Sequence, residues 1–178
     1  MKYLVASDIH GSLFYAKKII DKFKDEQADK IILLGDLYYH GPRNPLPNEY
    51  NPMEVSKLLN SMKDDLLVIK GNCDAEVDEM ISEFKFSENI KLEIGTKKFH
   101  FTHGHKYNIN NIPEDCDVLI YGHFHAGFIT VEDGIICVNA GSVSLPKNDT
   151  KNSFLVITDE YIELKDFDGN IVDKKYYN

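Results

Sequence analysis

Seven side chains of the kinds that bind divalent metal ions occur in short polar segments spread along the sequence. They are Asp8, His10, Asp36, Asn72, His103, His123 and His125. Asp8 and His10 are two positions apart, as are His123 and His125, and in an extended segment such positions point to the same side. Glycines adjoin most of the seven and would let the backbone turn sharply beside a ligand. The pattern predicts a shared metal site.

The ligand types narrow the choice of metal. Imidazoles, carboxylates and one amide, without a cysteine, favour manganese, iron, nickel or zinc over a thiolate zinc site, and they suffice for two ions that share a carboxylate. Each residue taken alone has an ordinary alternative: Asp8 could cap a helix, and Asn72 could form an Asx-turn. For all seven together this is the weaker interpretation, because each lies beside a glycine or in one of the two pairs.

Two such ions would suit the hydrolysis of phosphate esters. Cations about 3.5–4 Å apart can hold a hydroxide at neutral pH, because metal binding lowers the pKa of water. They also neutralise the charge that builds on the phosphoryl oxygens. We therefore expect a bridging hydroxide to attack phosphorus in line with the leaving group.

The elements that would position these residues alternate in the first half of the chain. Short apolar runs at 3–6, 31–34 and 66–69 predict buried strands, and each ends just before a candidate ligand. Helical spacing between the runs predicts helices that begin after Ser12, after Asn51 and after Asp74, the last carrying Val77, Met80 and Ile81. This order indicates parallel strands, whose carboxyl ends collect ligands.

The second half of the chain reads as strands alone. Alternating and apolar runs predict strands at 90–94, 98–102, 118–121, 128–131, 135–138, 154–158, 161–164 and 170–174. Two sheets packed face to face and flanked by helices would accommodate both halves. No linker or repeat is visible, so we expect one domain over residues 1–178.

Composition limits the function classes. The chain has 178 residues, with 20 Lys and Arg against 29 Asp and Glu, for a net charge of −9. Such a surface repels phosphate backbones, which argues against long nucleic acids as partners. Three cysteines without paired spacing indicate a reducing compartment. With no signal-like N-terminus and no apolar stretch of about 20 residues, we expect a cytoplasmic protein without a membrane partner.

The motifs resemble those of a known family, the calcineurin-like metallophosphoesterases. The resemblance runs from Asp8 to about Pro146 and rests on DIHG, GDLYYHGPR, GNCD, THGH and GHFH, in that order. GNCD, THGH and NAGSVSLPK together resemble the small subgroup of YfcE-type phosphodiesterases, which shares its fold with the retromer subunit of eukaryotes. The resemblance implies an α/β fold, a four-layer α-β-β-α sandwich of two mixed sheets flanked by helices.

The resemblance also implies which residues hold each metal. The first ion would be held by Asp8, His10, Asp36 and His125. The second would be held by Asp36, Asn72, His103 and His123, with Asp36 as the bridge. Manganese is the first expectation, with iron, nickel or zinc as alternatives. Catalytic roles fall on His10, Asp36, Asn72 and Cys73.

One position departs from the family pattern. Where the wider family has a histidine that helps to protonate the leaving oxygen, this chain has Cys73. A thiol is a poor hydrogen-bond donor, so we expect activity on phosphodiesters and aryl esters and weak activity on alkyl phosphomonoesters. The alternative is that Cys73 only packs near the site.

Further residues are substrate candidates. His40 and Arg43 follow Asp36 in a loop, and Arg43 could contact a phosphate, although such arginines are usually only solvated. His105 could face the substrate from beside His103. Asp74 could orient Asn72 or, as we favour, cap the helix after it.

The leading hypothesis is a metal-dependent phosphodiesterase acting on a small aryl or nucleotide-like diester. A homo-oligomer is compatible with this hypothesis. A second hypothesis is a catalytically silent scaffold or binding module of the same fold, but such a protein tends to lose a ligand, and none is missing here. A phosphomonoesterase or a dinucleotide polyphosphate hydrolase is a third. Cys73 weighs against a monoesterase, and nothing in the sequence decides on the polyphosphate hydrolase.

Overall fold

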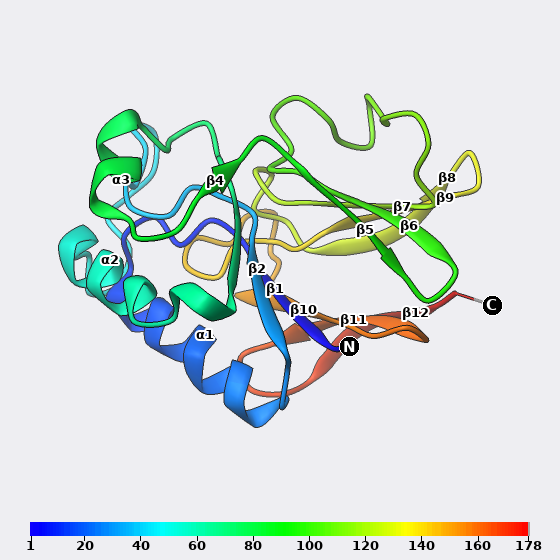
Figure 1. Cartoon of the computed structure of the whole chain (residues 1–178), viewed down its shortest axis with the longest axis horizontal. Coiled ribbons are helices and arrows are strands. Elements are labelled where there is room, and N and C mark those ends of the chain that lie inside the picture. The colour runs from blue at the N-terminus through cyan, green and yellow to red at the C-terminus, as the bar shows by residue number, and fades with distance from the viewer. Residues whose placement is uncertain (178) are drawn as a thin grey trace.

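The chain alternates strands and helices up to Ile81 and continues with strands alone, as the sequence predicts (Figure 1). The computed structural model describes residues 1–177. The helices are α1 (Leu13–Asp25), α2 (Pro52–Asn60), the short 3₁₀ helix η1 (Lys63–Asp65) and α3 (Glu76–Ile81). The strands are β1 (Tyr3–Ala6), β2 (Lys30–Leu33), β3 (Leu66–Ile69), β4 (Phe86–Ser87), β5 (Ile90–Ile94), β6 (Lys97–Phe101), β7 (Val118–Tyr121), β8 (Phe128–Glu132), β9 (Ile135–Asn139), β10 (Ser153–Ile157), β11 (Tyr161–Asp166) and β12 (Ile171–Tyr176).

The strands form two mixed sheets. The seven-stranded sheet has the order β12-β11-β10-β1-β2-β3-β4, and the five-stranded sheet has the order β5-β6-β7-β9-β8. Strands β1 to β4 run parallel, as do β6, β7 and β9. Each sheet therefore has a block of parallel strands whose carboxyl ends open on one edge, and the predicted pair of mixed sheets is confirmed.

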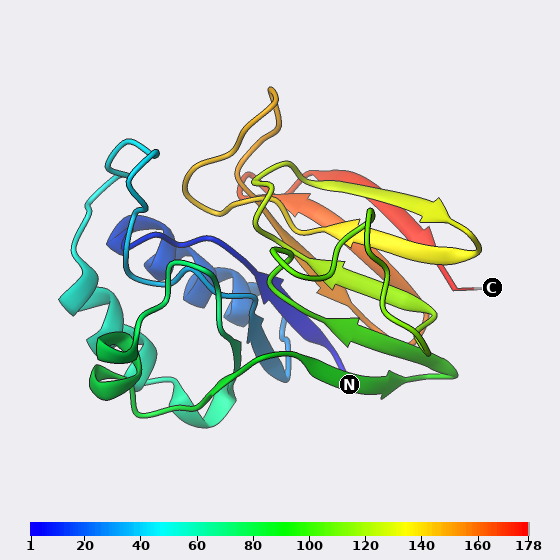
Figure 2. The same ribbon diagram turned by 90° about the horizontal axis from the view of Figure 1, so that it is seen from above.

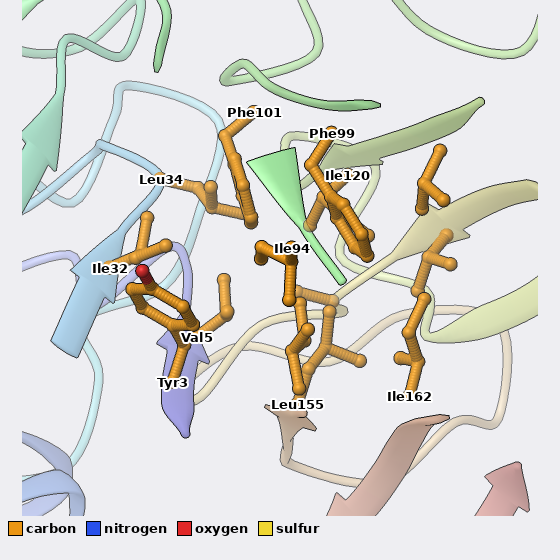
Figure 3. Packing of buried hydrophobic residues seen from close by; sticks show 14 of the residues in the cluster. Tyr3, Val5, Ile32, Leu34, Ile94, Phe99, Phe101, Ile120, Leu155 and Ile162 are labelled. Carbon is orange, nitrogen blue, oxygen red and sulfur yellow. The ribbon is translucent and has the colours of Figure 1, made fainter. Parts of the chain in front are cut away.

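The main core lies between the two sheets (Figure 3). Val5 and Ile32 of the first sheet face Phe99, Phe101 and Ile120 of the second, and all five are buried. Alternate residues of the same strands, such as Leu4 and Ile31, face the helices instead. Strands buried on both faces need an unbroken apolar run, which is the sequence signal that predicted them.

In the described residues 1–177, helices cover just one outer face of the sandwich. All three α-helices lie on the same side of the molecule in both ribbon views (Figures 1 and 2), and α1 and α2 pack on the seven-stranded sheet. Within the described residues, the outer face of the five-stranded sheet is covered by the loop between β6 and β7. Ile109 and Ile112 of this loop pack on Leu119 and Tyr121. The fourth layer is therefore a loop, because its Asn and Pro residues favour turns over a helix.

The helix starts test the predicted caps. The Ser12 hydroxyl accepts a hydrogen bond from Tyr15 N, and the Asn51 side chain accepts one from Glu54 N. These two predictions are confirmed. The prediction that Asp74 caps α3 is wrong: Ala75 takes that position, and its N–H donates to Asp78.

The expected apolar stripe of α3 is not buried. Val77 and Met80 are 59% and 83% exposed, while Ile81 is half-buried. A helix of six residues is too short to bury a full stripe. In residues 1–177, no helix combines the length and apolar character that crossing a membrane requires.

Candidate metal centre and active site

The candidate ligands lie at the carboxyl ends of parallel strands from both sheets. Asp8 and His10 follow β1, Asp36 follows β2, and Asn72 follows β3. From the other sheet, His103 follows β6, and His123 and His125 follow β7. Ligand-type atoms of these residues form three tight groups, each within 4.8 Å: Asp8, His10 and His125; His10, Asp36 and Cys73; Asp36, His103 and His123.

The first group contains a buried carboxylate oxygen that lacks a partner. Asp8 Oδ1 makes no hydrogen bond to residues 1–177, although it lies 3.2 Å from His125 Nε2 and 3.6 Å from His10 Nε2. The two Nε2 atoms are themselves 3.2 Å apart. Such an arrangement requires a proton or a cation among the three atoms. The residues present therefore fit a metal ion.

Backbone carbonyls orient three of the imidazoles. His10 Nδ1 donates to Tyr39 O at 2.7 Å, and His125 Nδ1 donates to Leu145 O at 2.7 Å. His103 Nδ1 donates to Leu34 O at 2.8 Å. A carbonyl can only accept, so each Nδ1 carries a proton and each ring turns its Nε2 toward the cluster, where a metal ion would take the place of a second proton. This is the usual outer support of a metal-binding histidine.

Asp36 lies between the two halves of the site. Its Oδ2 is 3.7 Å from His10 Nε2, and its Oδ1 is 3.5 Å from His103 Nε2. Asn72 Oδ1 lies 2.9 Å from the same His103 nitrogen, and the His123 ring centroid lies 5.1 Å from that of His103. Of all the candidate residues, Asp36 has the position suited to a shared ligand.

Left-handed backbone conformations gather at the site. Five of the seven candidate ligands have a positive φ, between 51° and 63°: Asp8, His10, Asp36, His123 and His125. This region disfavours residues other than glycine and is populated when the surroundings enforce it. Its repetition at five polar residues indicates that the chain gives up local stability to aim these side chains inward.

Neighbouring polar groups hold these strained turns. Both carboxylate oxygens of Asp74 accept backbone N–H bonds, from Asp36, Leu37 and Gly71, at 2.7–2.8 Å. Asp74 thus joins the turns after β2 and β3, and it neither caps α3 nor bonds to Asn72. Gly71 is required there, because a Cβ at this position would collide with the Asp36 carboxylate.

The segment NAGSVSLPK supports the other side of the site. The hydroxyl groups of Ser142 and Ser144 both donate to the backbone carbonyl of Asp8 at 2.9 Å. The same segment supplies Leu145 O, the acceptor for His125. The segment therefore has a structural role, because it helps to position the candidate ligands Asp8 and His125.

The charges of the cluster are strongly coupled. Burial would raise the pKa of Asp8, but the adjacent imidazoles of His10 and His125 hold the pKa well below its usual value. Burial opposes protonation of His103, yet Asp36 and Asp8 raise the pKa of its imidazole to about 9. Carboxylates that stay ionised in a buried cluster favour an additional positive charge there.

Cys73 lies at the edge of the cluster. Its backbone N–H donates to Asp36 Oδ1 at 2.8 Å. Burial, together with the negative charge of Asp36, raises the pKa of its thiol to about 12. The thiol therefore stays neutral at physiological pH and is not an activated nucleophile.

A cavity of about 410 Å³ opens onto the cluster. It is lined by His10, Asp36, Tyr39, Gly41, Pro42, Arg43, Asn44, Asn72, Cys73, His123, His125 and Lys147. Of the three predicted substrate residues, only Arg43 is in this lining. The His40 ring packs between Tyr39 and Tyr50, with ring centroids 4.8 and 5.3 Å away. The exposed His105 lies beside His103 and His123, outside the cavity lining.

Five lining residues escaped the sequence analysis: Tyr39, Gly41, Pro42, Asn44 and Lys147. Two of them also contact the backbone or side chain of a candidate ligand. Lys147 ends the NAGSVSLPK segment, and its backbone N–H bonds to His125 O. Tyr39 stands inside GDLYYHGPR, and its carbonyl holds His10. Both belong to motifs already singled out, but a Tyr or Lys in a loop carries no spacing that distinguishes a cavity wall from a solvated surface.

Comparison with known proteins agrees with this geometry. Residues 1–160 match the family model described as a calcineurin-like phosphoesterase superfamily domain. The chain belongs to the calcineurin-like phosphoesterase superfamily. It is 36% identical over 169 residues to phosphodiesterase YfcE of Escherichia coli K12, covering 92% of this chain and 91% of that relative.

Solved structures confirm the fold of this metallophosphoesterase. The structure of YfcE, described as a phosphoesterase from E. coli, superposes with a TM-score of 0.96 at 33% identity and full coverage of both chains. Vacuolar protein sorting 29 from Cryptosporidium parvum has a TM-score of 0.67 at 16% identity, covering 98% of this chain and 97% of that one. The second likeness concerns the fold alone.

Family membership settles several expectations. The predicted metallophosphoesterase fold with its two mixed sheets, the predicted family with its YfcE-type subgroup, and the prediction of a phosphoric ester hydrolase are confirmed. In residues 1–177, the expected outer helical layer on the five-stranded sheet is replaced by a loop. The family also implies divalent metal ions, and the three groups of ligand atoms fit that requirement.

Proposed function

We propose that this metallophosphoesterase is a phosphodiesterase that uses two divalent metal ions. The observation that carries the proposal is the position of Asp36, whose two oxygens face His10 and His103 from opposite halves of one cluster. Asp8, His10, Asp36 and His125 would hold the first ion. Asp36, Asn72, His103 and His123 would hold the second. Manganese is the metal we propose, with iron, nickel or zinc as alternatives.

When bound, two such ions supply a nucleophile from water and stabilise negative charge on the phosphoryl group. The chain's own residues then fix where the ester lies. Arg43 and Lys147 line the cavity, and neither forms an ion pair within residues 1–177. Two available cations beside the cluster would attract and orient a phosphate anion despite the net charge of −9.

The Cys73 thiol, a weak proton donor beside the cluster, limits the range of substrates that we expect. A neutral thiol with a pKa of about 12 gives little help to a basic leaving oxygen. We therefore propose phosphodiesters with an aryl or nucleotide-like group as substrates and alkyl phosphomonoesters as poor ones. A dinucleotide polyphosphate remains a second candidate class, because the two cations could also hold a phosphate chain.

The net charge and the cysteines of the chain bear on its partners and on the compartment in which it works. The net charge of −9 favours a small phosphodiester over a long nucleic acid or an anionic membrane surface. The three cysteines are all thiols, which suits the cytoplasm. A homo-oligomer is compatible with these features. A silent scaffold is less favoured, because all seven candidate ligand positions carry side chains able to bind a metal.

The test is replacement of the shared carboxylate. Asp36→Ala should lower hydrolysis of bis(4-nitrophenyl) phosphate in the presence of Mn²⁺ by more than about a hundredfold, since even outer-shell changes at metal sites cost 10–100-fold. Metal content per chain should fall as well. Asp21→Ala removes an exposed carboxylate from α1 and serves as the matched control. Full turnover by Asp36→Ala would overturn the proposal.

A further inference from the structure

An apolar groove lies next to the catalytic cavity. Its volume is about 320 Å³, and it is lined by Tyr38, Tyr39, Tyr50, Pro52, Cys73, Ala75, Val77 and Asp78. Tyr39 and Cys73 also line the catalytic cavity, so the two spaces meet at these residues. The groove runs along the first residues of α2 and α3, the helices that share one side of the molecule in both ribbon views (Figures 1 and 2).

Two polar groups in the groove lining are already paired within the chain. The Tyr38 hydroxyl is hydrogen-bonded to Ser82 Oγ at 2.7 Å. The Asp78 carboxylate accepts the Ala75 N–H at 2.8 Å. The rest of the lining consists mainly of aromatic rings, a proline, an alanine and a valine, with the hydroxyl groups of Tyr39 and Tyr50 and the Cys73 thiol beside them.

The aromatic wall of the groove is braced. Tyr39 and His40 pack edge to face, and His40 packs in the same way against Tyr50. Tyr39 is nevertheless 43% exposed, and Val77, which lines the same groove, is 59% exposed. Large apolar side chains left open beside a cavity mark a binding surface. Rings held in this way are suited to stacking on another planar ring.

Charge separates the two spaces. Arg43 and Lys147 line only the catalytic cavity, together with the metal-binding candidates. The groove has no cationic residue in its lining. A molecule that spans both would place an anion among the cations and an uncharged, flat group beyond Tyr39 and Cys73. A volume of about 320 Å³ lies at the lower end of the roughly 300–1,000 Å³ of small-molecule sites.

We propose that this groove binds an aromatic group esterified to the phosphate, with Tyr39 and Val77 as its specificity-determining contacts. The assignment rests on the proposed phosphodiesterase function and names one arm of its substrate. A simple aryl ester and a nucleoside ester share this chemistry. Val77, which the short α3 leaves exposed, would then have a binding role in the groove.

The absence of tryptophan from the chain allows a binding test. In Tyr39→Trp, fluorescence should be quenched saturably by 4-nitrobenzylphosphonate, a nitroaromatic phosphonate that the enzyme cannot hydrolyse, with Mn²⁺ present. Methylphosphonate, which lacks the ring, should not quench. Tyr176→Trp makes the same change at an exposed residue of β12 outside both linings and should show only collisional quenching.

A matched pair of variants on α3 then locates the ring. Added to Tyr39→Trp, Val77→Asn should weaken phosphonate binding about three- to tenfold, in line with the loss of a small apolar contact in a pocket. Met80→Asn makes a similar change on an exposed residue outside the groove and should leave binding unchanged. In the wild-type background, Val77→Asn should raise KM for bis(4-nitrophenyl) phosphate by a similar factor, with metal content unchanged.

The outcomes separate the two proposals. Equal effects of Val77→Asn and Met80→Asn, or an altered oligomeric state with unchanged binding, would overturn the groove assignment and leave the phosphodiesterase proposal standing. Val77-dependent binding without hydrolysis of any diester would overturn the proposed function and leave the groove. Adenosine 5′-phosphate and phenyl phosphate as competitors distinguish a nucleobase from a simple aryl ring.

Discussion

Cys73 stands where the resembled family pattern has a histidine, and we expect this residue to limit the substrates that the site can hydrolyse. Its thiol lies at the junction of the catalytic cavity and the apolar groove, and Asn72 Nδ2 donates to its Sγ at 3.4 Å. If this thiol is the proton donor, we expect the leaving oxygen to receive little help from it. That is acceptable for an aryl oxide and poor for an alkoxide.

Cys73→His should therefore raise activity on an alkyl phosphomonoester at least about tenfold, since general-acid help is typically worth 10²–10⁴-fold. The effect on bis(4-nitrophenyl) phosphate should be much smaller, because its leaving group needs no proton. The measurement is kcat/KM for glycerol phosphate and for the aryl diester with Mn²⁺. Cys73→Ser, which adds no imidazole, is the control, and an unchanged monoester rate in Cys73→His would remove the argument.

At this scale the sequence predicted which residues would meet, but it could not predict how they are held. Asp8 and His10 are two positions apart, and Asp36 follows an apolar run. These features were sufficient to predict that the three residues lie close together. The positive φ values and the carbonyl partners of the histidines depend on contacts between distant segments. The roles of Asn72 and Cys73 as ligand and catalytic residue stay predictions.

Among the elements, the turns after β2 and β3 are joined by one buried carboxylate. Asp74→Ala would leave the N–H groups of Asp36, Leu37 and Gly71 without their acceptor. Each unsatisfied buried donor costs about 1–3 kcal/mol, so the free energy of unfolding should fall by about 3 kcal/mol or more. Urea unfolding measures this loss.

Glu76→Ala, an exposed change in the first turn of α3, is the control for the loss of Asp74 and should leave stability nearly unchanged. A decline in metal affinity should accompany the loss of stability, since Asp74 fixes the backbone of Asp36. Equal stability of the two variants would show that water replaces Asp74 without cost.

A second carboxylate closes the turn between β11 and β12 and predicts a pH dependence. Asp166 is buried and accepts hydrogen bonds from the N–H and side chain of Asn170, and Lys151 lies 2.7 Å away. Burial alone would raise the pKa of Asp166, but Lys151 and Asn170 hold it well below its usual value of 3.8. Its stabilising effect is therefore complete above about pH 4 and is lost as the pH falls.

Asp166→Asn should lower the free energy of unfolding by about 1–2 kcal/mol at pH 7, mostly through the turn, because the exposed Lys151 contributes little. The difference from wild type should narrow as the pH drops below 4. Urea titrations at pH 7 and pH 3.5 test this, and a difference that stays constant across that range would contradict it.

Elements with strong local signals were predicted well, and those set by tertiary contacts were not. The parallel strands β1 to β3 are recognisable in the sequence as unbroken apolar runs. Ser12 and Asn51 indicate where α1 and α2 begin. The two-residue strand β4 has no such pattern and exists through its pairing with β3. The loop over the five-stranded sheet is likewise defined by what it covers.

At the scale of the whole molecule, the candidate site is built from both sheets. Asp8, His10, Asp36 and Asn72 come from the seven-stranded sheet, and the three remaining histidines come from the five-stranded one. Ions held between them would therefore tie the sheets together. The assignment of all 178 residues to one domain stays a prediction, and residue 178 lies outside the described part.

Metal binding should accordingly stabilise the fold as a whole. A ligand that binds only the native state at one hundred times its Kd adds about 2.7 kcal/mol per site. Mn²⁺ should therefore raise Tm by several degrees in a concentration-dependent manner, and EDTA should reverse the shift. Differential scanning calorimetry of the chelated and reloaded protein measures it.

Asp36→Ala separates this site-specific stabilisation from weak binding of Mn²⁺ to the acidic surface. Removing the shared carboxylate should abolish most of the Mn²⁺-dependent shift, whereas Asp21→Ala, with the same change in net charge, should keep it. Because the candidate ligands come from both sheets, the shift should appear in a single cooperative transition rather than in a separate local one. An equal Mn²⁺ response in the two variants would place the stabilising ions elsewhere on the molecule.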